Sequence, residues 1–378
     1  MAEALKHFFD ASLVRQIARD LATVHRGFAE RAFVDECVAG LAERELLARA
    51  WHIADVMHAF LPPSFDAAAQ VILGSLGPEL EQTEGHGLAP FRYLPHVLFV
   101  QKHGLDDFEL AMTAQHALTR RFSAESSIRP FLERYPQRTL ARLREWATDP
   151  SAHVRRLVSE GTRPRLPWAP RLRAFIVDPA PVLALLERLK DDAERYVQRS
   201  VANNLNDIAK DHPDLVVATC RRWAETPSRA TPFIVRHALR SLVKRGHRGA
   251  LAVLGAGTRP NVQVSRIRLA KQVRIGGELS FAFSITSKSS RAQDLVVDYA
   301  VYFVKSRGDV RPKVFKLKRV VLEARETIEL SGKVSFSQMT TRKHYPGKHR
   351  VQVLVNGVAS SDADFTASPS SWPKGDPR

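Results

Sequence analysis

The spacing of apolar residues changes near residue 260 of this 378-residue chain. Before that point, apolar residues recur at intervals of three and four, as in Leu13, Ile17 and Leu21, which is the spacing of an amphipathic helix. Beyond it, apolar and polar residues alternate, as in residues 278–285 and 295–304, which is the spacing of β-strands. The change of period predicts a helical domain followed by a strand-rich domain.

Turn signals divide the strand-rich part into short segments. Gly-Gly, Pro-Gly and Asn-Gly pairs occur at residues 276–277, 346–347 and 356–357. About seven short strands within roughly 100 residues are typical of an immunoglobulin-like β-sandwich. The predicted strands are residues 278–285, 295–304, 313–318, 327–330, 333–336 and 347–355. We expect helices in residues 1–258, an all-β sandwich in residues 259–366 and a loose tail in residues 367–378.

The helical part contains an internal repeat. Residues 149–158 (DPSAHVRRLV) align with residues 192–201 (DAERYVQRSV), which places Val197 43 positions after Val154. A third copy at residues 232–239 places Val235 another 38 positions on. Both spacings lie near the ~40–47 residues of HEAT and armadillo units. Such units stack into an α-solenoid whose concave face suits an extended partner, and we expect an all-α solenoid of this type.

The chain is strongly basic, with 57 Lys and Arg against 40 Asp and Glu, a net charge of +17 and a pI near 10.2. Residues 260–366 hold 19 Lys and Arg and 9 Asp and Glu, which gives +10. The excess indicates a polyanionic partner, most simply nucleic acid. We expect the clusters that contain Lys316, Lys318, Arg342 and Lys343 to face phosphates. The alternative is that this charge only keeps the surface soluble.

Several classes of protein are excluded. The two cysteines, Cys37 and Cys220, lie far apart, which excludes a disulfide framework and fits a reducing cytoplasm. No apolar run approaches ~18 residues, and the N-terminus lacks the pattern of a secretory signal, so we expect a cytoplasmic protein without a membrane partner. No phosphate-binding glycine motif occurs, and the 14 His show no ligand spacing. We expect no cofactor and no metal.

Charged and amide residues share one face of the repeated helices. Arg199, Asn203, Asp207 and Lys210 are spaced by four, four and three residues, which places them on one side of a helix. The preceding unit places Arg156, Glu160 and Arg163 on a similar stripe. Ordinary exposed helices favour Lys and Glu pairs instead. These residues either bind an extended partner or join neighbouring repeats by hydrogen bonds.

Three carboxylates and one tryptophan stand out as candidate site residues. Glu125, Glu160 and Asp207 lie near the starts or the inner faces of the repeated helices. Trp168 lies in a proline-bounded connection beside a basic cluster. The indole either faces a partner or packs between helices as a core aromatic.

The sequence resembles the AlkC branch of the DNA alkylation repair glycosylases with HEAT-like repeats, a sister of the AlkD branch. The resemblance covers roughly residues 1–366, and a C-terminal immunoglobulin-like domain is a feature of one subset of that branch. It depends on three segments: residues 122–131 (FSAESSIRPF), residues 154–168 (VRRLVSEGTRPRLPW) and residues 197–213 (VQRSVANNLNDIAKDHP).

The resemblance implies a monofunctional DNA N-glycosylase. The family hydrolyses the glycosidic bond of cationic alkylated bases, chiefly 3-methyladenine and 3-methylcytosine, in duplex DNA, without flipping the base and without a cofactor. The implied roles are catalytic for Glu125, Glu160 and Asp207, and substrate-binding for Trp168 and Arg156. We expect Arg163, Arg199, Asn203 and Lys210 to contact DNA beside Lys316, Lys318, Arg342 and Lys343, and we expect a monomer.

Two other hypotheses remain at this point. A non-catalytic scaffold would also use HEAT repeats and an immunoglobulin-like domain, because both are common protein-binding modules. An architectural DNA-binding protein would bend the duplex without chemistry. Glu125, Glu160, Asp207 and Trp168 argue against both, because a scaffold predicts apolar or Lys/Glu-rich concave positions and a DNA-bending protein predicts no acids that face phosphates.

Overall fold

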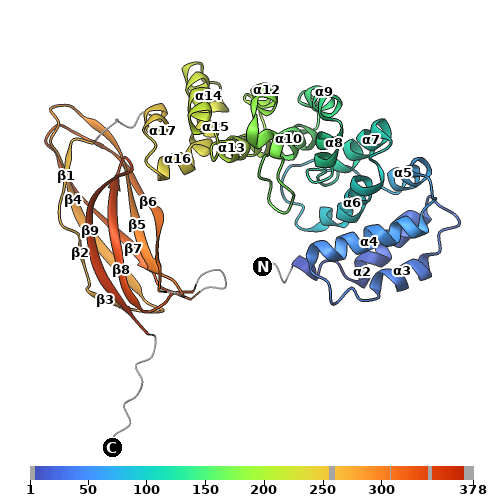
Figure 1. The fold of residues 1–378 in the computed structure, drawn as a ribbon, viewed down its shortest axis with the longest axis horizontal. Helices are drawn as coiled ribbons and strands as arrows, with labels where there is room; N and C mark the ends of the chain where they lie inside the picture. The colour runs from blue at the N-terminus through green and yellow to red at the C-terminus, as the bar shows by residue number, and fades with distance from the viewer. Residues whose placement is uncertain (1–4, 255–259, 307, 339–342, 370–378) are drawn as a thin grey trace, which may run out of the picture. The chain divides into compact units, whose positions relative to one another are not determined.

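A computed structural model describes residues 5–254, 260–306, 308–338 and 343–369 (Figure 1). These residues form helices followed by a two-sheet β-sandwich, which confirms the predicted fold class. One compact unit comprises residues up to 212 together with residues 226–238. The other comprises residues 213–225 and the described residues from 239 onward. The predicted boundary at residue 258 lies outside the described residues, as does the predicted tail from residue 370.

The first unit contains all but three of the described helices. Its helices are α2 (Ala11–Ala22), α3 (Glu30–Val38), α4 (Leu46–Phe60), α5 (Phe65–Gly74), η1 (Ala89–Tyr93), α6 (Leu94–His103), α7 (Phe108–Thr119), α8 (Ile128–Arg134), α9 (Pro136–Trp146), α10 (Ala152–Gly161), α11 (Arg173–Val177), α12 (Ala180–Leu189), α13 (Arg195–Ile208) and α15 (Thr231–Ala238). The second unit contains α14 (Pro213–Glu225), α16 (Arg240–Lys244) and α17 (Arg248–Val253).

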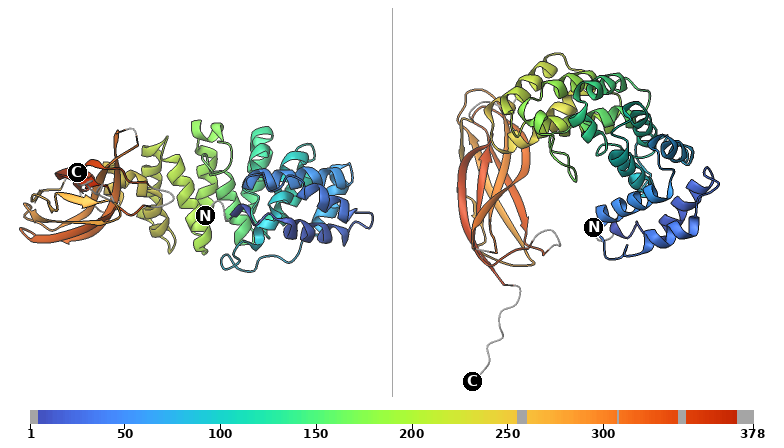
Figure 2. Two further views of the ribbon diagram at one scale, coloured as in Figure 1. Left: turned by 90° about the horizontal axis from the view of Figure 1, so that it is seen from below. Right: turned by 45° about the vertical axis from the view of Figure 1, so that its right-hand side comes forward.

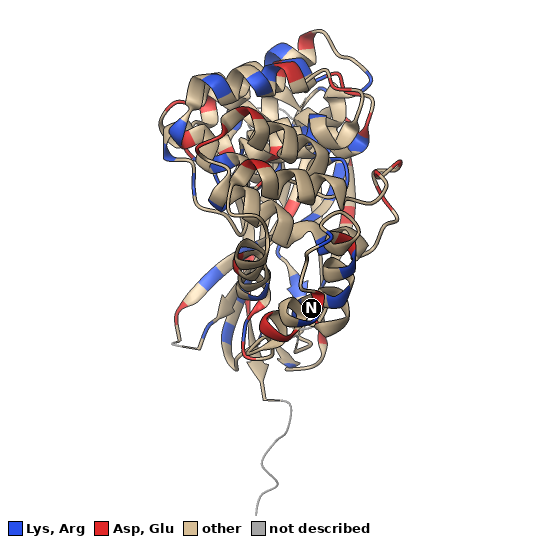
Figure 3. Cartoon of the chain, turned by 90° about the vertical axis from the view of Figure 1, so that its right-hand side faces the viewer, with Lys and Arg blue, Asp and Glu red and all other residues tan. Residues whose placement is uncertain are grey.

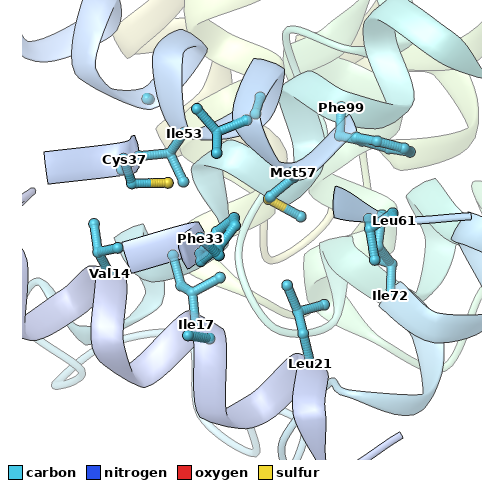
Figure 4. Packing of buried hydrophobic residues seen from close by; sticks show 14 of the residues in the cluster. Val14, Ile17, Leu21, Phe33, Cys37, Ile53, Met57, Leu61, Ile72 and Phe99 are labelled. Atoms are coloured by element: carbon cyan, nitrogen blue, oxygen red, sulfur yellow. The ribbon is translucent and has the colours of Figure 1, made fainter. Parts of the chain in front are cut away.

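Helices α2 to α6 enclose the first hydrophobic core (Figure 4). Helix α2 begins where the Asp10 carboxylate accepts hydrogen bonds from two backbone N–H groups of the first turn. Its apolar stripe places Val14, Ile17 and Leu21 in the core, where Phe33 of α3 is fully buried. Burial of each such side chain stabilises the fold by about 1.5–3 kcal/mol.

The repeated helices lie side by side. Helix α13 packs between α10 and α15, and the two views of Figure 2 show the helices of this unit stacked in succession. The aligned residues Val154, Val197 and Val235 are all buried, on α10, α13 and α15 respectively. The spacing of the repeat therefore reports real structural equivalence, and it places the polar faces of α10 and α13 next to each other.

The sandwich consists of two sheets around one core. Strand β4 (Glu278–Ser287) pairs with β1 (Val262–Val264), β2 (Arg268–Leu269) and β7 (Thr327–Ser335) in the first sheet. The second sheet has the order β3 (Gln272–Arg274), β9 (Val358–Ser368), β8 (Gly347–Val355), β5 (Gln293–Val304) and β6 (Val310–Leu322). Alternate residues of both sheets, among them Phe283, Val301 and Val353, fill the core.

Two strand predictions were wrong in detail. The predicted strands at residues 327–330 and 333–336 form the single strand β7, in which Gly332 lies opposite Phe281 of β4. A Cβ atom at Gly332 would lie 2.8 Å from Phe281 Cε1 and closer still to Cζ, so this glycine accommodates a ring rather than a turn. Strand β9 was not predicted, because its Ser- and Asp-rich exposed face weakens the alternation.

We expect Gly332→Ala to lower the free energy of unfolding by about 1–3 kcal/mol, because the added methyl group overpacks the Phe281 ring. Thermal unfolding of the full chain, followed by near-ultraviolet circular dichroism, measures the effect. Ser331→Ala, at the exposed neighbouring position, is the matched control and should unfold like the native protein. Equal unfolding temperatures for the two variants would contradict this account of the glycine.

Candidate active site

Six side chains of alternating charge form a continuous row across three helix ends, which we call the charge ladder. Arg156 Nη1 lies 2.7 Å from Glu125 Oε2, and Arg156 Nη2 lies 3.7 Å from Glu160 Oε1. Arg163 donates to Glu160 and, through Nε at 2.8 Å, to Asp207 Oδ2. Lys210 Nζ completes the row at 2.7 Å from Asp207 Oδ1. The ladder consists of Glu125, Arg156, Glu160, Arg163, Asp207 and Lys210.

Local sequence positions each member. Glu125 precedes α8, Arg156 and Glu160 lie one turn apart on α10, and Asp207 and Lys210 lie at the end of α13. Because α10 and α13 pack together, the connection after α10 brings Arg163 to Asp207, 44 residues along the chain. Figure 3 shows Lys and Arg interspersed with Asp and Glu along these helices. The ladder thus joins two repeats, as the hydrogen-bonding interpretation of the polar faces predicted.

The three acids differ in accessibility. The side chains of Glu160 and Asp207 are 7% and 3% exposed, whereas that of Glu125 is 29% exposed. Burial alone would raise the pKa of Glu160, but Arg156, Arg163 and the hydroxyl of Ser200 hold that pKa below its ordinary value. Glu160 therefore stays ionised at neutral pH although it is buried. Glu125 is the acid of the ladder that a substrate reaches most easily.

Neutral hydrogen bonds fix the ladder further. Ser200 of α13 donates to Glu160 Oε2, and Ser123 donates to Glu125 Oε2 at 2.8 Å. Asn204 Nδ2 donates to the backbone carbonyl of Ser159 at 2.7 Å, which ties α13 to α10. Buried charges require partners of this kind, because an unpaired charge costs several kcal/mol of desolvation.

Trp168 lies at a strained, exposed position. Its φ of 60° is a left-handed conformation, and its side chain is 67% exposed. A bulky residue with positive φ is a genuine outlier, which persists only when its surroundings impose it. The interpretation of Trp168 as a core aromatic is therefore wrong. Exposure of a large indole on a constrained backbone is typical of a binding residue.

Arg129 holds the connection that carries Trp168. Its guanidinium group donates to the backbone carbonyls of Gly161 at 3.0 Å, Arg163 at 2.8 Å and, from Nε at 3.1 Å, Pro170. The residue is 2% exposed, and burial lowers its pKa to about 10. Sequence reasoning missed this residue, although it lies within the segment at residues 122–131. A buried arginine that binds three carbonyls fixes the loop from both ends.

Glu125, Arg156 and Trp168 line a cavity of about 560 Å³. Tyr196 of α13 also lines it, and the Arg156 guanidinium lies over the Tyr196 ring at 5.0 Å from the ring centroid. His153 packs edge-on against the same ring, and burial lowers the pKa of its imidazole. Sequence reasoning missed Tyr196, whose only signal was its place one residue before Val197 in the repeat.

The remaining predicted residues lie apart from the ladder or outside the described residues. Arg199 is exposed, 3.9 Å from Glu84, and Asn203 contacts His237 of α15 at 3.1 Å. In the second unit, Lys316 and Lys318 are exposed on β6, and Lys343 is exposed. Arg342 lies outside the described residues. The prediction that these side chains bind DNA stays a prediction.

We expect Arg129→Met to reduce catalytic activity at least about tenfold, because it frees the loop that holds Trp168 and Arg163. Arg134→Met, on the same helix but half exposed and paired with Asp106, is the matched control. Limited proteolysis around residues 161–170 should become faster in the first variant alone. Unchanged proteolysis and unchanged activity in Arg129→Met would contradict the positioning role.

Two further searches concern only the described part of the chain. Its His, Cys, Asp and Glu residues form no group of three that could hold a metal ion. None of its helices has the length and apolar character needed to cross a membrane.

Comparisons with known proteins define the class first. A family model described as a DNA alkylation repair enzyme matches residues 118–242, the segment that contains the ladder. A model described as the C-terminal Ig-like domain of the uncharacterised protein YhaZ matches residues 263–369. The helical unit therefore belongs to the DNA alkylation repair enzymes, and the sandwich is Ig-like.

Two relatives then give the family. The chain is 34% identical over 366 residues to the uncharacterized protein YhaZ of Bacillus subtilis (strain 168), covering 96% of this chain and 98% of that protein. It is 38% identical, with a TM-score of 0.88, to Pseudomonas fluorescens alkylpurine DNA glycosylase AlkC bound to DNA containing an abasic site analog, covering 96% and 99% of the two chains. The chain belongs to the AlkC family of DNA glycosylases.

Proposed function

We propose that this chain removes cationic alkylated bases, chiefly 3-methyladenine and 3-methylcytosine, from duplex DNA and leaves an abasic site. The observation that carries the proposal is the partly exposed Glu125 carboxylate, held beside the exposed Trp168 indole at one cavity. The P. fluorescens relative, an alkylpurine DNA glycosylase, supports the same chemistry. Membership of a glycosylase family argues against the scaffold and architectural hypotheses.

The reaction is hydrolysis of the N-glycosidic bond. Alkylation at N3 makes the base a cation, so the base leaves as a neutral molecule and needs no protonation. Positive charge then develops on the sugar, and a fixed carboxylate stabilises it. We assign this role to Glu125, which can also orient or deprotonate the attacking water. Glu160 and Asp207 add negative potential and hold Arg163 in place.

Recognition depends on the charge of the base. An indole face attracts a cation by about 0.5–2 kcal/mol, and Trp168 is exposed enough to meet a base that remains near the stack. We propose that the base is not flipped into a pocket before the bond breaks. Arg199, Lys210, Lys316, Lys318 and Lys343 are exposed cations that can neutralise phosphates.

Lesion choice tests the proposal. We expect the protein to release 3-methyladenine and 3-methylcytosine from duplex DNA in single-turnover assays, and to leave hypoxanthine and uracil in place, because the last two are neutral. Released bases are measured by mass spectrometry, against protein-free DNA as the control. Release of uracil at a comparable rate would show that the site does not read charge.

A further inference from the structure

The cavity beside the charge ladder has a second, apolar end that the chemistry above does not use. Its walls there come from α4, η1, α6 and the turn before α8, and they consist of Leu47, Trp51, Phe91, Leu94, Leu98 and Phe122. We call these six residues the apolar compartment. Leu94 and Leu98 are buried, and the other four are half-buried against the N-terminal core.

Polar groups mark the other end of the same cavity. Glu125, Arg156 and Trp168 line it together with Ser123 and Tyr196, so the cavity runs from the proposed reaction centre into the apolar compartment. Its volume of about 560 Å³ lies within the range of about 300–1,000 Å³ found for pockets that hold drug-sized ligands. A single methyl group on a base would leave most of that volume empty.

We infer that the apolar compartment binds the alkyl substituent of the damaged base, and that the substrate class therefore includes N3 adducts much larger than methyl. The inference rests on the proposed function, because Glu125 and Trp168 place the cationic ring at the polar end. A straight or aromatic hydrocarbon chain on that ring then enters the compartment while the ring stays outside it. The walls offer such a chain aliphatic and aromatic surface only.

Burial supplies the expected size of the effect. Each methylene moved from water to an apolar site contributes about fourfold, equivalent to about 0.8 kcal/mol. A butyl group carries three more methylenes than a methyl group, so its full burial could offset a considerable loss elsewhere. Filling the compartment should remove this gain for butyl adducts and leave methyl adducts unaffected.

The test uses duplex DNA alkylated in separate batches by methyl and butyl methanesulfonate. The native full-length protein should release both 3-methyladenine and 3-butyladenine faster than protein-free DNA loses them, as measured by mass spectrometry. Leu47→Trp fills the compartment, and we expect it to lower the ratio of butyl to methyl release at least tenfold. Leu215→Trp, at an exposed position of α14 that does not line the cavity, should leave the ratio unchanged.

Each result decides one statement. Release of 3-methyladenine without release of 3-butyladenine above the spontaneous rate would overturn the inference and leave the proposed function intact. Release of both bases with an unchanged ratio in Leu47→Trp would also overturn it. Failure of the native protein to release 3-methyladenine would overturn the proposed function and the inference together. Retained 3-methyladenine release by Leu47→Trp shows that this variant folds.

Discussion

Replacing Glu125 by glutamine should reduce single-turnover excision of 3-methyladenine by about 10²–10³-fold, the loss typical of removing one preorganised electrostatic group from an active site. The glutamine keeps the size of the side chain and an oxygen that can accept from Ser123, but it removes the negative charge that Arg156 now balances. Because that charge is 29% exposed at the cavity, its loss acts on the substrate rather than on the core. Affinity for undamaged DNA should stay the same or rise slightly.

A matched control separates charge at the cavity from ion pairing in general. Glu109 pairs with Arg138 and Arg142, but it lies outside the cavity and is 62% exposed. Glu109→Gln should therefore excise 3-methyladenine at the native rate. Native-like excision by Glu125→Gln would remove this residue from the mechanism.

Asp207→Asn should produce a loss of similar size, about 10²–10³-fold, through a different route. Asp207 is 3% exposed and binds Arg163 and Lys210 with its two oxygens. An amide can satisfy only one of these cations, so Arg163 and Glu160 lose a fixed partner. Breaking a buried ion pair also destabilises a fold, by about 3–5 kcal/mol. Thermal unfolding must therefore be measured beside excision.

The neighbouring acid provides the control for Asp207. Asp211 pairs with Arg165 at 2.8 Å, but both side chains are partly exposed. We expect Asp211→Asn to change excision less than about threefold, since partly exposed ion pairs contribute about 0–1 kcal/mol. An Asp207→Asn protein that unfolds early yet excises normally when folded would assign this residue to stability alone.

Much of the fold could be predicted because its signals are local. The change of apolar period separates helices from strands, and the repeated Val154, Val197 and Val235 mark helices that stack. Strand β9 and the unbroken β7 escaped prediction, because the fit of Gly332 against Phe281 depends on a strand about 50 residues away.

The candidate site was predictable in composition but not in arrangement. Glu125, Glu160 and Asp207 follow from helical spacing and from the family resemblance. Their difference in exposure does not, because it depends on partners such as Arg163 and Ser200 that come from other elements. Arg129 contacts carbonyls as far as 41 residues away, and no spacing rule connects a residue to those groups.

The apolar compartment could not be predicted for the same reason. Its walls combine Leu47 and Trp51 with Phe91 and Phe122, from segments that read as ordinary core residues in the sequence. Only their meeting beside Glu125 turns them into a candidate binding surface.

The central claim is that this site stabilises positive charge on the sugar through Glu125. The most direct test compares affinity for duplex DNA with a cationic pyrrolidine abasic analogue and with a neutral tetrahydrofuran analogue. A transition-state mimic should bind more tightly where the complementary charge is fixed. We predict that the native protein prefers the cationic analogue at least about tenfold and that Glu125→Gln loses this preference. Equal affinity of the native protein for the two analogues would contradict the account.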